Sequence, residues 1–147
     1  MEIDFYNLII KIISTPEYQT MKNHRHHIKT NTYSHSIKVA YLCYKFYKKF
    51  NMKINLTSLI RGALLHDYYL YDWHIKTKDT KWHGFKHPKR AYNNAIRDYA
   101  NINKIEKDII LHHMFPLTII PPKTKEGWIV CIMDKIAAIS DYLKRKS

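Results

Sequence analysis

Two acidic residues interrupt apolar runs of the sequence, where a lone carboxylate is costly to bury. Asp67 follows His66 at the end of the run LIRGALLHD, and Asp134 interrupts the run WIVCIMDKIAAI. His35 opens a third segment whose following turns have the apolar pattern of a core helix. A buried carboxylate needs a counter-charge or a metal ion, because its desolvation is otherwise uncompensated. Imidazole and carboxylate groups together form a mixed nitrogen and oxygen ligand set, so the pattern predicts a divalent metal site.

Helices are expected to position these residues, because the chain has only 3 Gly and 5 Pro and so little turn material for many short strands. Apolar residues recur at helical spacing, and the resulting helices are predicted at residues 3–14, 33–50, 56–69, 88–100, 103–114 and 124–146. Residues 71–86 have no steady period and are predicted to form a loop. Asn55, and Asn103 with Glu106, are suitable N-caps, and Pro88 suits a first helical turn. The fold class predicted is all-α, a single-domain bundle of about six helices over residues 1–147.

The charge of the chain favours anionic partners. There are 25 Lys and Arg against 12 Asp and Glu, a net charge of +13. The Lys-, Ile-, Asn- and Tyr-rich composition is equally typical of an AT-rich genome, so a functional and a genomic origin of the charge both stay open. No apolar run is long enough to span a bilayer, and acidic residues precede the first apolar stretch, which favours a cytoplasmic protein with no membrane partner. Cys43 and Cys131 lie far apart in apolar patterns and are predicted to be buried, reduced thiols.

The order of the candidate ligands resembles that of the HD superfamily of metal-dependent phosphohydrolases. The strings YSHSIKVA, LIRGALLHDYYLYDW and CIMDKIAAIS are similar to its three metal-binding helices. Two further strings, HGFKHPKRAYNNA and LHHMFPL, are similar to the extra histidine segments of members that hold two metals. An HD dipeptide alone is common by chance, whereas all five pieces in order are specific. The resemblance covers residues 33–140 and is nearest to small, stand-alone bacterial HD-domain proteins, mostly of unassigned substrate.

The resemblance implies a complete ligand set. One metal would be held by His35, His66, Asp67 and Asp134; Asp67 would bridge to a second metal held by His87 and His113. His112 is the rival to His113, and His113 is preferred because the matching segment of the resembling group reads HMWPL. One or two ions of Mn(II), Fe(II), Co(II) or Ni(II) suit these ligands, and Zn(II) is a further option.

The implied activity is hydrolysis of a phosphoester by metal-activated water, on a nucleotide or a related small molecule, as a phosphomonoesterase or a phosphodiesterase. Asp67 is also a predicted catalytic residue, with Asp72 and His74 in the following loop as candidates to orient water or protonate a leaving group, and His83 beside them. Six residues are candidates to bind substrate: Arg61, Lys86, Lys89, Arg90, Lys135 and His27. For each of these residues, the alternative interpretation is an ordinary solvated surface residue without a role in binding.

Two other functions remain open. The first is a nuclease directed at single strands, since CRISPR-associated HD nucleases share this residue order and Trp73, Phe85 and Tyr92 lie among basic residues. The second is a non-catalytic binding module whose fold is stabilised by a metal ion. The complete ligand set argues against this function, because non-catalytic modules usually lack a ligand. Cyclic-di-GMP turnover is not favoured, because the GYP signature is absent and FPLTIIPP follows LHHM. The helix face from Tyr41 to Tyr47 is a candidate exposed dimer interface; the oligomeric state is not predicted.

Overall fold

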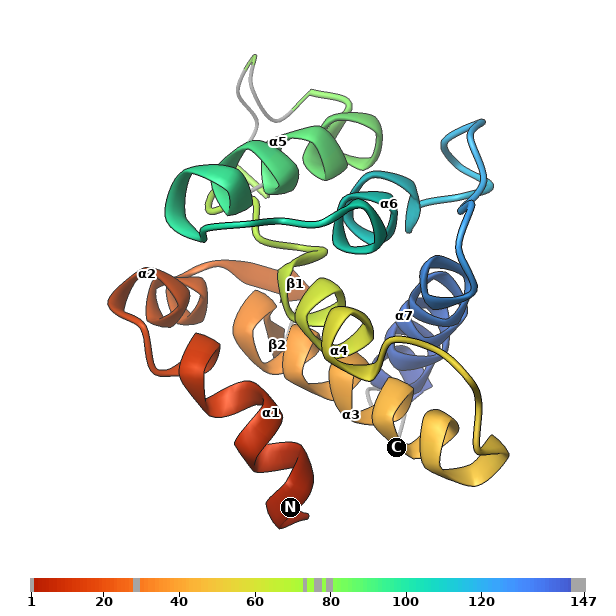
Figure 1. Ribbon diagram of the computed structural model, residues 1–147. Coiled ribbons are helices and arrows are strands. Elements are labelled where there is room, and N and C mark those ends of the chain that lie inside the picture. Colours follow the sequence, from red (N-terminus) through yellow and green to blue (C-terminus); the bar gives the residue numbers. More distant parts are fainter. Residues whose placement is uncertain (1, 28–29, 73, 76–77, 79–80, 144–147) are drawn as a thin grey trace.

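The computed structural model describes residues 2–27, 30–72, 74–75, 78 and 81–143 (Figure 1). The described helices are α1 (Ile3–Ile13), α2 (Pro16–Gln19), the 3-10 helix η1 (Thr20–Asn23), α3 (Thr32–Phe50), α4 (Leu56–Leu65), α5 (His83–Asp98), α6 (Lys104–His112) and α7 (Lys125–Leu143). Strands β1 (Arg25–His27) and β2 (Thr30–Asn31) form a short antiparallel ladder. The protein is all-α, as predicted, and the two helices that the sequence did not predict are the four-residue α2 and η1.

Helix α4 lies at the centre of the bundle, in contact with α1, α3, α5, α6 and α7 (Figure 1). This position follows from its apolar sequence, in which even Ser58 and Gly62 are buried. A Cβ atom added to Gly62 would clash with the Ile109 side chain of α6, so glycine permits the two helices to approach closely. The ends of α4 and α6 are therefore held side by side.

Helix α4 is shorter than the prediction of residues 56–69, because it ends at Leu65. His66, Asp67, Tyr68 and Tyr69 are all buried. Four consecutive residues cover every side of a helix, so a helix with one exposed side cannot bury all of them. The chain instead leaves the helix, and the Tyr68 hydroxyl donates a hydrogen bond to Asp98 Oδ2 at 2.8 Å.

Helix α5 begins at His83, five residues before the predicted start at Pro88, so the predicted loop is shorter than residues 71–86. The additional turn is held by the His83 ring, which stacks on the His87 ring at 4.6 Å and packs edge-on against Tyr69 at 4.9 Å. Pro88 lies inside the helix, where it cannot donate the usual backbone hydrogen bond to Gly84. The other predicted helices agree with the structure to within about two residues, and Asn103 and Glu106 form the predicted capping box. The predicted end of the last helix, at residues 144–146, lies outside the described residues.

The tyrosine face of α3 is not an exposed interface. Tyr44 is buried, and the Phe5 ring of α1 lies 5.3 Å from the Tyr44 ring and 5.2 Å from the Tyr41 ring. Helix α1 thus covers this face within the same chain. Cys43 and Cys131 are buried free thiols, as predicted.

Among the described residues, no helix combines the length and hydropathy that a membrane crossing requires.

Candidate metal centre

Ends and inner faces of five helices bring six predicted ligands together. His35 lies in the first turn of α3, His66 and His113 directly follow α4 and α6, and Asp67 comes next after His66. His87 and Asp134 lie within α5 and α7. The four histidines and Asp67 are buried, and Asp134 is half-buried.

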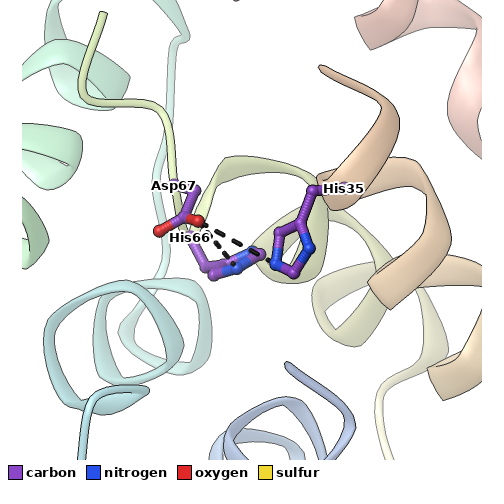
Figure 2. Close-up of side chains that lie close together, drawn as sticks. All are labelled: His35, His66 and Asp67. Atoms are coloured by element: carbon purple, nitrogen blue, oxygen red, sulfur yellow. Dashed lines mark ion pairs between the residues drawn. The ribbon is translucent and has the colours of Figure 1, made fainter. Parts of the chain in front are cut away.

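The first group consists of His35, His66, Asp67 and Asp134. The Nε2 atom of His35 lies 2.8 Å from Asp134 Oδ1 and 4.0 Å from Asp67 Oδ2. The Nε2 atom of His66 lies 3.5 Å from each of these same two oxygens. Figure 2 shows the two imidazoles and the Asp67 carboxylate converging from α3 and the end of α4. Two nitrogens and two oxygens therefore face one small volume.

The second group uses the other oxygen of Asp67. Its Oδ1 atom lies 3.1 Å from His87 Nε2 and 3.4 Å from His113 Nε2, and the two ring nitrogens are 2.9 Å apart. Asp67 thus presents one carboxylate oxygen to each group. A single side chain between two clusters of ligand atoms is the arrangement expected of a bridging carboxylate.

The separations fit a metal ion better than they fit hydrogen bonding. Ligand atoms bonded at about 2.1 Å to one ion lie about 3.0 Å apart at a right angle and about 4.2 Å apart across the ion. The separations within both groups run from 2.8 to 4.0 Å. Three overlapping sets of ligand atoms each lie within 4.8 Å of one another: His35 with His66 and Asp67; His66 with His113 and Asp134; Asp67 with His87 and His113.

The second ring nitrogen of three histidines is committed to the backbone. Nδ1 of His66, His87 and His113 lies 2.7, 3.2 and 2.9 Å from the carbonyls of residues 63, 83 and 110. A carbonyl only accepts hydrogen bonds, so each Nδ1 carries a proton and each Nε2 is the ring nitrogen that faces the cluster and can bind a metal ion. Nε2 of His66 is buried and has no hydrogen-bond partner among the described residues. Such an atom is costly unless a ligand such as a metal ion binds it, so the donor set fits a divalent ion.

Charges within the cluster shift its pKa values in opposite directions. Burial lowers the pKa of His35, but the carboxylates of Asp134 and Asp141 outweigh it and raise that pKa to about 9. Burial raises the pKa of Asp134, but the hydrogen bond from His35 and the neighbouring His66 ring outweigh it and hold the pKa well below its usual value. Burial lowers the pKa of His113. Near neutral pH Asp134 is therefore ionised and His113 neutral, which are the forms that bind metals, whereas His35 is protonated and must release its proton when a metal binds.

Asp141 is a residue of the site that was not predicted from the sequence. Its Oδ2 atom lies 3.8 Å from His35 Nδ1, and the carboxylate also pairs with Lys38. A carboxylate behind a ligating histidine fixes the orientation of the ring. Its spacing from Asp134 could have indicated this position: Asp141 follows Asp134 by seven residues, and two turns of a helix place both residues on one face.

The structure brings His113, and not His112, into the cluster. Nδ1 of His112 lies 2.7 Å from Asp108 Oδ1, on the side of α6 where Lys123 and Thr124 also donate to Asp108.

The predicted catalytic pair Asp72 and His74 forms a local contact. Asp72 Oδ1 accepts a hydrogen bond from the His74 backbone N–H at 2.9 Å and lies 3.1 Å from His74 Nδ1. The first of these bonds is the main reason that the pKa of Asp72 is lowered. His74 is exposed and Asp72 is half-buried. His83 lies nearer the cluster, stacked on His87, with its Nδ1 2.7 Å from the Tyr71 hydroxyl.

The predicted substrate-binding residues fall in different places. Lys86 and Lys89 are exposed on α5, and the Arg90 guanidinium lies over the Tyr71 ring at 4.6 Å. Lys135 Nζ donates a hydrogen bond to the carbonyl of His113 at 3.1 Å. His27 belongs to β1, and its side chain lies outside the described residues.

Arg61 is not brought to the cluster. It pairs with Glu106 at 3.1 Å and donates to the Ala100 carbonyl at 2.7 Å. Glu106 is in the first turn of α6, whereas His113 follows the last turn, so the two ends of α6 separate Arg61 from the cluster.

Comparison with known proteins gives one match. No curated protein and no solved structure matches the chain. The model of the HD domain matches residues 32–139, which contain all six candidate ligands. Because this match spans most of the chain and the buried His and Asp cluster lies within it, the protein belongs to the HD-domain family.

Proposed function

We propose that the protein is a metal-dependent phosphohydrolase that hydrolyses a phosphoester of a nucleotide or a related small molecule. The observation that carries the proposal is the position of Asp67, whose two oxygens face separate groups of histidine nitrogens. The ligand set suits Mn(II), Fe(II), Co(II) or Ni(II), with Zn(II) as a further option, and has room for one or two ions.

The roles of the residues follow from their positions. His35, His66 and Asp134 would hold one ion and His87 and His113 the other, and Asp67 would contribute one carboxylate oxygen to each group. A divalent ion in such a site lowers the pKa of a water ligand and polarises a phosphoryl oxygen. Asp72 fixes the orientation of the His74 ring through Nδ1, which prepares His74 to pass a proton to the leaving group.

The start of α5 supports a nucleotide as substrate. Trp82 and Phe85 are exposed, and their rings form an edge-on contact at 6.1 Å. Exposed aromatic rings stack on nucleobases, and the exposed Lys86 on the same turn supplies a positive charge for phosphate. His87, a candidate ligand, follows in the next turn of this helix. We propose that a base and a phosphate bind at this end of α5, the helix that also carries His87.

The proposal is tested with protein purified without a histidine tag, loaded with Mn(II) and assayed on p-nitrophenyl phosphate and bis-p-nitrophenyl phosphate. We expect hydrolysis of one of these esters, and the preferred one distinguishes a monoesterase from a diesterase. His112→Ala is the control for His113→Ala, because the two histidines are adjacent and only His113 faces the cluster. If the protein binds metal stoichiometrically but hydrolyses neither ester and no nucleotide, the proposed phosphohydrolase activity is contradicted and a binding module is indicated.

A nuclease directed at single strands is the second candidate, favoured by the same exposed rings of Trp82 and Phe85 on a chain of net charge +13. Tyr92 is half-buried beneath Lys107, and Trp73 lies outside the described residues. A nuclease would bind single-stranded DNA with an affinity that falls steeply as salt rises. Cleavage of single-stranded DNA at rates above those on mononucleotides would favour this candidate.

A further inference from the structure

The outer face of α7 carries an apolar stripe. Trp128, Ile132, Ile136, Ile139 and Leu143 are separated by three or four residues, and each is between 41% and 59% exposed. This spacing places them on one side of the helix, opposite the side that carries Asp134. From Ile132 onward the intervals alternate between four and three, the pattern by which two helices pack against each other. We call these five residues the α7 stripe.

Lys125, in the first turn of α7, is exposed on the same side as the stripe, but the later charged residues of the helix are not. Each of these is buried or half-buried and is engaged elsewhere in the chain: Glu126 with the backbone of Asn55, Asp134 with His35, Lys135 with the His113 carbonyl, and Asp141 with Lys38. The outer face of α3 is the opposite case, because Lys45, Lys48 and Lys49 are exposed on it. From Ile132 to Leu143 the stripe therefore has no exposed charge beside it, which is unusual on a chain of net charge +13.

We propose that the α7 stripe is the interface at which two copies of this chain pair about a twofold axis, with their α7 helices antiparallel. Two copies of so basic a protein repel each other, and the repulsion is smallest where the fewest lysines lie between them. An anionic partner such as nucleic acid or an acidic membrane surface would instead require cations on this face. A stripe of like residues is complementary to itself, as a twofold interface requires.

The antiparallel orientation follows from the helix dipoles. A parallel pair would place the two partial negative charges at the C-terminal ends of α7 side by side, whereas an antiparallel pair places the partial positive end of one helix beside the partial negative end of the other.

The available area is sufficient for a dimer. Large side chains carry about 150–250 Å² of surface each. At the observed exposures, the stripe and the adjacent Tyr142 offer on the order of 600 Å² per copy, or about 1,200 Å² in a pair. That total is the lower end of the range for stable, specific interfaces. The Phe115 ring, which lies 5.5 Å from the Trp128 ring, extends the apolar surface at one end.

Sedimentation equilibrium of the full, metal-loaded chain tests this proposal. We expect the wild type to have twice the chain mass of 17.7 kDa at micromolar concentrations. Ile136→Glu places two carboxylates near the twofold axis and is expected to weaken dimerisation at least a hundredfold, giving a folded monomer. Ile96→Glu on α5 is the matched control, because Ile96 is 50% exposed against 44% for Ile136, and it should remain a dimer.

Circular dichroism confirms that each variant is folded, and Ile139→Lys replaces Ile136→Glu if that variant does not fold. A wild type that is monomeric up to high micromolar concentration would overturn the proposal and leave the stripe to a different partner. Equal dimerisation of the Ile136 and Ile96 variants would also overturn it. Cysteines introduced at both Ile132 and Ile139 should cross-link two copies, whereas cross-linking of Ile132→Cys alone would overturn the antiparallel orientation.

Discussion

At the scale of single residues, the hydrogen bond that each histidine makes through Nδ1 determines how its Nε2 atom can bind a metal ion. The backbone carbonyls that face Nδ1 of His66, His87 and His113 leave Nε2 as the atom with the lone pair. Each of these rings is oriented to bind a cation through Nε2 without rotating, whereas His35, whose pKa is raised to about 9, must first release a proton. The cluster is therefore organised before a metal arrives.

His113→Ala should weaken metal binding, whereas its neighbour should not matter. Nε2 of His113 lies 3.4 Å from Asp67 Oδ1, while His112 is engaged with Asp108. We expect a loss of about 100-fold or more in Mn(II) affinity for His113→Ala and a change within about threefold for His112→Ala, measured by calorimetric titration. Equal losses in the two variants would place the second ion elsewhere.

Asp141→Asn tests the carboxylate behind His35. The neutral amide no longer stabilises a charge on the ring or holds its Nδ1–H, so we expect metal affinity to fall about 10- to 100-fold. The pKa of His35 in the metal-free protein, followed by NMR, should drop from its value of about 9. Ser140→Ala is the control, because Ser140 contacts the same Lys38 without touching His35. An unchanged affinity and an unchanged His35 pKa would show that Asp141 only anchors Lys38.

The ligands were largely predictable from sequence because a carboxylate is rarely placed in an apolar run unless a cation or a metal ion compensates its charge. Asp67 and Asp134 stand out for this reason, and family resemblance supplied His87 and His113. Arg61 was misleading, because an arginine that pairs with Glu106 has the same sequence pattern as one that binds phosphate.

At the scale of elements, helix ends deliver most of the site. His66 and His113 follow the last turns of α4 and α6, and His35 lies in the first turn of α3. The sequence predicted these helices from their apolar period and their caps. It did not predict where α4 ends or where α5 begins, because burial of Tyr69 and ring stacking of His83 decide those points, and both are tertiary contacts.

Asp108 of α6 holds the two residues that precede α7, and its removal should destabilise the protein. Its Oδ2 accepts hydrogen bonds from the backbone N–H of Lys123 and Thr124 and from the Thr124 hydroxyl. Asp108→Asn should lower the free energy of unfolding by about 1–3 kcal/mol at neutral pH, measured by urea denaturation. Asp4→Asn, at an exposed carboxylate in the first turn of α1, is the control and should change it by less than about 0.5 kcal/mol.

The same variant should change the pH dependence of stability. Burial raises the pKa of Asp108, but hydrogen bonds from Thr124, His112 and the backbone outweigh it and lower the pKa. A lowered pKa in the folded state gives stability that is present above the unfolded pKa and is lost as the pH falls toward the folded pKa. Between about pH 7 and about pH 3.5 the wild type should therefore lose more stability than Asp108→Asn. Parallel pH profiles for the two proteins would contradict this role.

At the scale of the whole molecule, the candidate metal centre joins five helices. Its candidate ligands come from α3, α5 and α7 and from the ends of α4 and α6. The sequence predicted an all-α bundle, but which helices adjoin depends on close approaches such as that of Gly62 to Ile109. The net charge could be predicted as well, but not that α7 would expose an apolar stripe.

Metal removal should lower the stability of the whole bundle. An ion that binds only the folded state adds about 2.7 kcal/mol when its concentration is about 100 times its dissociation constant. We expect a chelator to lower the melting temperature by several degrees and added Mn(II) to restore it, as measured by circular dichroism. A melting temperature that is insensitive to both chelator and metal would show that the cluster is satisfied without an ion.

The most direct test of the central claim is the metal content and phosphoester hydrolysis of the untagged wild type beside Asp67→Asn. The substitution keeps the shape of the side chain and removes the charge shared by the two ligand groups. We predict at least one transition-metal ion per wild-type chain with hydrolysis of p-nitrophenyl or bis-p-nitrophenyl phosphate, and loss of both in the variant while circular dichroism shows it folded. A wild type that carries no metal and takes up none on titration would contradict the account.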